Sequence, residues 1–137
     1  MVTVLDRLAA LREHLDHLRY LRPQVIDPEA LRNDLSLRNN VLRSLQVTCQ
    51  AVLDIAGELS VRRGLRFEGY AAAIRNLAAF SEFPSSLVQD LEVLPELRDL
   101  IVYSPAAPDF PRVVEALDGL EPIENFVEVV KEIEATS

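Results

Sequence analysis

Hydrophobic residues recur at helical spacing along most of the chain, with polar residues between them. Near the N-terminus the leucines follow one another at steps of three, four and three residues, at Leu8, Leu11, Leu15 and Leu18. These steps place their side chains on one face of an amphipathic helix. Because proline disfavours helical geometry in the residue before it, Pro23 predicts that this helix ends near Leu21.

A second apolar stripe predicts a helix of more than thirty residues. Its start is marked by Asp27, a favoured N-cap residue, followed by Pro28 at the first helical position. The stripe consists of Leu31, Leu35, Leu42, Leu45, Cys49, Val52, Ala56 and Leu59. Gly64 is a plausible C-cap after Arg62 and Arg63. We therefore expect one long helix between residues 27 and 64, at the centre of the fold.

Three further segments have helical spacing. They cover about Tyr70 to Phe80, a stretch that begins at Pro84 and continues through Ile101, and about Arg112 to Ala135. Pro95 predicts a kink or a restart in the second of these segments. The third is interrupted at residues 119–122, and residues 104–111 (SPAAPDFP) are expected to form a rigid loop.

No part of the chain shows the strict alternation of apolar and polar residues that is typical of strands. The pattern predicts an all-α fold, an antiparallel helical bundle of about five helices with one long central helix. No internal repeat or long linker divides the 137 residues, so residues 1–137 are expected to form a single domain.

The composition and the first residues of the chain indicate where in the cell the protein is expected to act. Hydrophobic residues make up 49% of the chain, yet no apolar run approaches the roughly 18–20 residues that span a bilayer. The first residues lack the basic and apolar regions of a signal peptide, which favours a cytoplasmic location without membrane contact. A single cysteine cannot form an internal disulfide, in agreement with a reducing compartment.

The net charge of −8 argues against a generally basic, nucleic-acid-binding surface. Thirteen of the 14 basic residues are arginine, so any RNA contact must come from a local arginine cluster. Arg62, Arg63 and Arg66 form the one such cluster. Capping of a helix C-terminus is the simpler interpretation of it, and a phosphate-contacting patch is the alternative.

Few other residues suggest chemistry. His14 and His17 lie three residues apart on the first helix, but no third ligand accompanies them, so a solvated polar face is expected and no metal site. Cys49 falls on an apolar stripe and is expected to pack in the core. Tyr20 and Tyr70 are also expected to be packing residues.

Three stretches resemble the HepT-like proteins of the HEPN superfamily. They are LRNNVLRSLQVTCQAVLDIAGEL (37–59), GYAAAIRNLAAFSEFPSSLVQDLEVLPELRDLIVYSP (69–105) and VVEALDGLEPIENFVEVV (113–130). The more diagnostic residues are Arg43-Ser44-Leu45-Gln46 followed by Gln50, Asp54 and Ala56. The resemblance implies a HEPN-type helical domain.

The resemblance also implies a function and partners. Proteins of this family are similar to metal-independent endoribonuclease toxins, which need no cofactor. They act as homodimers in which two signature motifs face a shared cleft that takes RNA. Their usual partner is a minimal nucleotidyltransferase antitoxin, which adds adenylate to a tyrosine of the toxin.

The family signature is arginine, a polar residue, three mostly apolar residues and histidine, with a tyrosine two residues later. In this chain Arg98 takes the arginine position, Asp99 the polar position and residues 100–102 (LIV) the apolar positions. Tyr103 stands in place of the histidine, and Pro105 in place of the modifiable tyrosine. The resemblance therefore names Arg98, Asp99 and Tyr103 as the candidate catalytic residues.

The replacement of histidine by Tyr103 affects the residue that would act as the general base. Metal-free RNA cleavage needs a base for the ribose 2′-hydroxyl and a cation for the phosphorane charge. Histidine has a pKa near 6.5, whereas tyrosine, near 10, stays protonated at neutral pH. Arg98 suits the phosphate, Tyr103 is a poor base, and Asp99 adds a negative charge beside the phosphate. We expect weak ribonuclease activity or none.

Two questions stay open at this point. Five helical residues correspond to roughly 140° around the axis, so Arg98 and Tyr103 converge only through helix unwinding or across a two-fold axis. The alternatives to a ribonuclease are a non-catalytic homodimer that binds RNA or a nucleotidyltransferase-like partner, and a structural helical adaptor with an acidic surface.

Overall fold

The described part of the chain is all-α, as the sequence pattern predicts. The structure, a computed structural model, describes residues 2–103 and 108–136. Its helices are α1 (Val4–Leu21), α2 (Pro28–Asn33), α3 (Leu35–Arg62), α4 (Tyr70–Asn76), α5 (Ser85–Leu91), α6 (Leu94–Tyr103), α7 (Phe110–Asp118) and α8 (Glu121–Thr136). Within these residues there is no strand, and no helix combines the length and apolar character of a membrane span.

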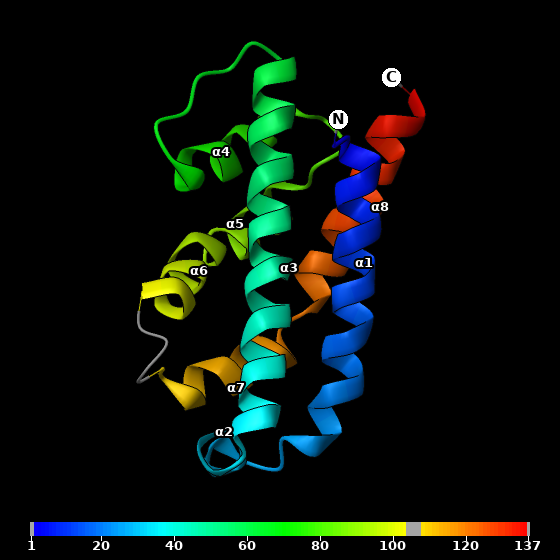
Figure 1. The fold of residues 1–137 in the computed structure, drawn as a ribbon. Coiled ribbons are helices and arrows are strands. Elements are labelled where there is room, and N and C mark those ends of the chain that lie inside the picture. The colour runs from blue at the N-terminus through cyan, green and yellow to red at the C-terminus, as the bar shows by residue number, and fades with distance from the viewer. Residues whose placement is uncertain (1, 104–107, 137) are drawn as a thin grey trace.

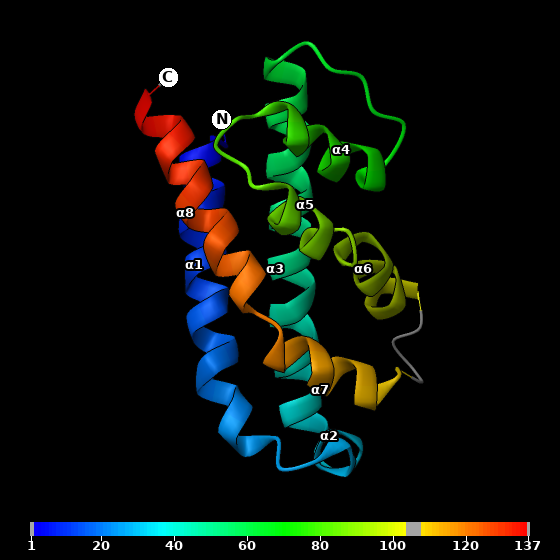
Figure 2. The same ribbon diagram turned by 180° about the vertical axis from the view of Figure 1, so that it is seen from behind.

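Helix α3 is the centre of the bundle (Figure 1). Helix α1 runs antiparallel beside it, and α4 and α6 pack against it on the other side. Seen from behind, α8 crosses the bundle and packs on α1 and α5 (Figure 2). Helices α2 and α7 contact each other at one end of the molecule, and both chain termini lie at the opposite end.

The long central helix is shorter than predicted, because the helical conformation is interrupted at Asp34. This residue has extended backbone angles (φ −112°, ψ 98°), and its carboxylate accepts a hydrogen bond from the Leu37 N–H at 3.0 Å. One residue thus ends α2 and caps α3. Leu35, which the predicted stripe included, is 58% exposed, whereas Leu31 and Leu37 on either side are buried.

The predicted ends of this region are confirmed. The Asp27 carboxylate accepts from the Ala30 N–H at 3.0 Å, and Pro28 occupies the first helical position. At the other end Gly64 has φ +74°, in the left-handed region that favours glycine. The Leu65 N–H then donates to the Ser60 carbonyl at 2.8 Å, which closes the helix end.

A proline and an aspartate mark two further helix starts. Pro95 produces a restart and not a kink, since α5 ends at Leu91 and Pro95 lies in the first turn of α6. Helix α7 begins at Phe110, two residues earlier than expected, because the Asp109 carboxylate accepts from the Arg112 N–H at 3.2 Å. The predicted rigid loop is therefore shorter at this end, and its residues 104–107 lie outside the described residues.

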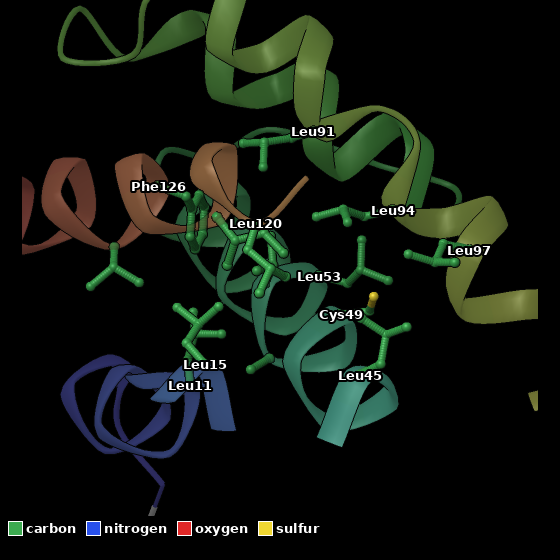
Figure 3. Close-up of a cluster of buried hydrophobic side chains, with 14 of the residues drawn as sticks. Leu11, Leu15, Leu45, Cys49, Leu53, Leu91, Leu94, Leu97, Leu120 and Phe126 are labelled. Carbon is green, nitrogen blue, oxygen red and sulfur yellow. The ribbon is translucent and has the colours of Figure 1, made fainter. Parts of the chain in front are cut away.

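The core is a single cluster that α3 shares with its neighbours. Leucines of α1, α3, α5 and α6 converge with Phe126 of α8 in Figure 3. Cys49 of α3 lies within this cluster with no exposed surface, which confirms its predicted packing role. Burial raises the pKa of the Cys49 thiol to about 12, so the thiol stays protonated and unreactive at neutral pH.

Candidate functional site

Arg98 lies at the edge of the contact between α6 and α3. Its neighbours Leu97 and Ile101 are buried and fix the rotation of α6 on α3. This rotation leaves the Arg98 side chain 21% exposed, at the border between core and solvent. The signature arginine is therefore held by the packing of the helix that carries it.

Gln50 of α3 holds the guanidinium group of Arg98. The Arg98 Nε donates to Gln50 Oε1 at 3.0 Å, and Arg98 Cζ lies 5.6 Å from the centre of the Tyr70 ring. The Gln50 amide in turn donates to Asp54 Oδ1 at 2.9 Å and lies 3.0 Å from the Tyr70 hydroxyl. These bonds fix the orientation of the Gln50 amide and, through it, that of Arg98.

The hydrogen bonds continue to the first helix. Arg7 of α1 donates from a terminal nitrogen to Asp54 Oδ2 at 3.1 Å. Its Nε is buried and 4.0 Å from Glu58 Oε2, too far for a hydrogen bond. We call Arg7, Gln50, Asp54, Tyr70 and Arg98 the Arg98 network. It connects four helices, α1, α3, α4 and α6.

An open pocket of about 310 Å³ adjoins this network between α1 and α3. Its polar lining includes Arg7, Gln50 and Asp54. Its apolar lining comes from Val2, Ala10, Val47 and Ala51. The network therefore lies at a surface that a ligand or a second protein can reach.

Asp99 forms an ion pair with Arg98. A terminal nitrogen of Arg98 donates to Asp99 Oδ1 at 3.0 Å, and the Asp99 side chain is 57% exposed. Because the pair lies at the surface, its attraction is screened by water and contributes little to stability. The negative charge does stand beside the guanidinium, as the sequence predicts.

Tyr103 is the last residue of α6, which stays helical from Leu94 onward. The helix is therefore not unwound between Arg98 and Tyr103, and the two backbone positions lie roughly 140° apart around its axis. Assembly across a two-fold axis, the other route to convergence, stays a prediction. Pro105 lies outside the described residues.

The two histidines were expected to lie on a solvated polar face, but both contact a buried side chain of α3. His14 Nδ1 lies 3.3 Å and His17 Nδ1 2.8 Å from the hydroxyl of Ser44, which is buried on α3. This contact joins α1 to α3. Within residues 2–103 and 108–136, no three ligating side chains form a group that could hold a metal ion.

The predicted packing of the two tyrosines holds for one of them. Tyr70 packs against the core and takes part in the Arg98 network. Tyr20 is 71% exposed, so its predicted packing role is wrong. Its ring stacks on the exposed His17, at a centroid distance of 6.4 Å.

Arg7 and Tyr70 are the members of the site that the sequence did not identify as functional. Neither belongs to the signature, and Arg7 precedes its partner Asp54 by 47 residues. The resemblance did single out Gln50 and Asp54, although only the structure shows that they contact Arg98 and Arg7.

Replacement of Gln50 by leucine tests the network. We expect Gln50→Leu to lower the free energy of unfolding by about 1–3 kcal/mol, because the partners of Gln50 lose their bonds in a half-buried site. Gln46→Leu, at an exposed position one turn earlier, should change it by less than about 0.5 kcal/mol. Urea denaturation measures both values, and equal stability of the two variants would contradict the network.

The chain is similar to known proteins over most of its length. Residues 5–130 match the family described as Ribonuclease HepT-like. A solved structure of a tri-AMPylated Shewanella oneidensis HEPN toxin in complex with an MNT antitoxin is 21% identical, with a TM-score of 0.81 over 94% of this chain and 96% of that chain. A toxin–antitoxin structure with AMP-PNP gives the same identity and TM-score over 94% of this chain and 97% of that chain. No curated protein sequence matches the chain.

These similarities bear on the expectations in two ways. The family match confirms the resemblance that the three sequence stretches indicated. The solved structures, at 21% identity, confirm the fold alone.

Proposed function

Since the chain belongs to the HepT-like ribonuclease family, we propose that it binds RNA through Arg98 and cleaves it slowly or not at all. The observation that carries this proposal is the hydrogen bond from Arg98 Nε to Gln50 Oε1, at 3.0 Å. An arginine that is oriented before its ligand arrives loses less conformational freedom when it binds phosphate. Gln50 gives Arg98 this orientation.

Cleavage is weak in this proposal because the base is missing. Tyr103 occupies the histidine position of the signature, and a phenol with an ordinary pKa near 10 rarely accepts a proton at neutral pH. Asp99 also competes with phosphate for Arg98, from 3.0 Å away. Arg98, Asp99 and Tyr103 thus form a site suited to holding RNA and poorly suited to cutting it.

A homodimer is the assembly in which this site would be complete. In one copy the backbone positions of Arg98 and Tyr103 lie roughly 140° apart around α6, so a two-fold axis would be needed to bring two signatures together around one RNA strand. We place this dimer in the cytoplasm, where its RNA substrates would be found.

A minimal nucleotidyltransferase antitoxin is the proposed protein partner. The similar solved structures are described as toxin–antitoxin complexes, one of them with an MNT antitoxin. The adenylate acceptor of the family signature corresponds to Pro105, which has no hydroxyl group. The partner therefore cannot modify this chain at that position.

A non-catalytic adaptor is the second candidate function. The ion pair between Asp99 and Arg98 favours it, because it neutralises part of the charge that RNA would use. In this alternative the homodimer binds a protein partner through the same face, and the acidic surface selects a basic partner.

Binding and cleavage of RNA by an Arg98→Ala variant test the proposal. A labelled pool of single-stranded RNA is incubated without metal. We expect the wild-type chain to bind it and Arg98→Ala to bind roughly 10- to 100-fold more weakly, since a charged hydrogen bond contributes about 1.5–3 kcal/mol.

Arg12→Ala is the matched control, since Arg12 pairs with Glu128 of α8, away from α6. It should bind RNA like the wild-type chain. If Arg98→Ala also binds and cuts RNA like the wild type, Arg98 is not the site. If the wild type binds no RNA, the adaptor function is favoured.

A further inference from the structure

One segment of this acidic protein is basic. Residues 60–80, which connect α3 to α4 and include α4, contain four arginines and a single acidic residue, whereas the whole chain has a net charge of −8. The arginines are Arg62, Arg63, Arg66 and Arg75. A local excess of this kind attracts anions even where the overall field does not.

Two of these arginines are engaged inside the fold. Arg62 pairs with Glu134 of α8. Arg63 donates to the Ala79 carbonyl at 3.0 Å, and its guanidinium lies 4.1 Å from the centre of the Phe80 ring. These contacts fasten the end of α3 to its neighbours, so the side chains of Arg62 and Arg63 have a structural role through partners outside α3, which differs from the predicted capping of the helix C-terminus.

Arg66 and Arg75 are different. Both are exposed, and neither forms an ion pair or a side-chain hydrogen bond within the part of the chain that the structure describes. They line one open pocket of about 400 Å³. Its remaining lining residues are Phe67, Glu68, Gly69, Ala71 and Ala72. Two cationic side chains thus line one surface, together with three small residues, the Phe67 ring and one carboxylate, that of Glu68.

The loop that carries Arg66 is anchored on both sides. Asn76 Nδ2 donates to the Arg66 carbonyl at 3.1 Å and to the Ser60 hydroxyl at 3.2 Å. Phe67 packs over Gly57 of α3 so closely that a Cβ at residue 57 would lie 3.2 Å from the ring. These contacts fix the backbone at Arg66, and Asn76, which bonds to it, directly follows Arg75 in the chain.

The pocket adjoins the Arg98 network. Gly69 and Ala71, which line it, are the residues on either side of Tyr70. The Tyr70 ring faces Arg98 at 5.6 Å. The pocket is therefore connected to Arg98 through Tyr70, whose two chain neighbours line it. Helix α4 and the loop before it lie beside α3 on the side of α6 (Figure 1).

We propose that Arg66 and Arg75 form a second phosphate-binding site, which holds the backbone of a single-stranded RNA next to the Arg98 site. The proposal rests on the proposed RNA function and adds the direction in which the strand leaves Arg98, across the start of α4. Guanidinium groups bind phosphate with two parallel hydrogen bonds, and the small residues between them let a sugar–phosphate backbone approach closely. Tyr70 offers an aromatic side chain between the two sites.

The test is the salt dependence of RNA binding by an Arg66→Gln/Arg75→Gln double variant. Fluorescence anisotropy follows a labelled single-stranded RNA of mixed sequence with the full-length chain, without metal. Each phosphate contact with a single strand contributes about 0.7 to the slope of log affinity against log salt concentration. We expect the double variant to bind about tenfold more weakly near physiological salt, with a slope shallower by roughly 1.4.

An Arg12→Gln/Lys131→Gln variant removes the same two charges from the α1–α8 face and should bind like the wild-type chain. Because all four side chains are at the surface, urea denaturation should give the same stability for each variant. Loss of affinity confined to the first variant supports the site. Equal losses in both variants, or none in either, overturn it while leaving the Arg98 proposal standing. Absence of RNA binding by the wild type overturns both proposals.

Discussion

The Tyr103→His variant will cleave single-stranded RNA about 100-fold faster than the wild-type chain in the absence of metal. A positioned general base contributes roughly 10²–10⁴ to the rate of such a reaction. An imidazole at residue 103 restores a group that is unprotonated at neutral pH, while Arg98 stays oriented by Gln50. Initial rates on a labelled RNA pool with a chelator present measure the gain.

The gain should depend on both halves of the signature. Adding Arg98→Ala to the Tyr103→His variant should abolish it, and Tyr103→Phe should gain nothing. The rate of Tyr103→His should rise with pH through about 6.5 and then level off, because the imidazole must lose its proton to act as a base. If the wild type already cuts as fast, the tyrosine is a working catalytic group. If no variant cuts, the adaptor function is favoured.

Loss of the Phe126 ring is expected to have the largest effect on stability. Phe126 lies in the cluster of Figure 3 and has no exposed surface. Its ring centre is 5.8 Å from that of Phe83. Truncating a fully buried aromatic residue to alanine costs about 3–5 kcal/mol. Since domains of this size are stable by roughly 5–15 kcal/mol, Phe126→Ala should leave the chain close to unfolding.

Urea denaturation followed by helical circular dichroism measures this loss. Val129→Ala on the same helix is the control, because Val129 is only partly buried and loses fewer atoms. We expect it to cost about 1 kcal/mol or less. A similar cost for both variants would mean that Phe126 is not at the centre of the core.

Helix boundaries could be read from the sequence wherever a capping residue stands beside the apolar stripe. Asp27, Pro28 and Gly64 fall where they were expected. The break at Asp34 was missed, because Leu31 and Leu35 fit one continuous helix by their spacing. The hydrogen bond from the Leu37 backbone N–H to the Asp34 carboxylate outweighs that spacing, and periodicity alone carries no information about such a competing cap.

The residues of the candidate site could be predicted from the sequence, but most of the contacts between them could not. The resemblance to the family named Arg98, Asp99 and Tyr103, and it also singled out Gln50. That Gln50 accepts a hydrogen bond from Arg98 could not be predicted, since the two residues are 48 positions apart and meet only through the packing of α6 on α3. The roles of Arg98, Asp99 and Tyr103 stay predictions, which the variants above test.

The burial of Cys49 makes this protein convenient for spectroscopic labelling. It is the single cysteine of the chain, has no exposed surface and keeps its proton at neutral pH. A cysteine introduced at an exposed position, such as Lys131→Cys, would therefore be the one thiol that a maleimide dye reaches in the folded protein. Each copy would then carry one probe, and Cys49 would not first have to be replaced. A symmetric pair of copies would then report a single distance between probes.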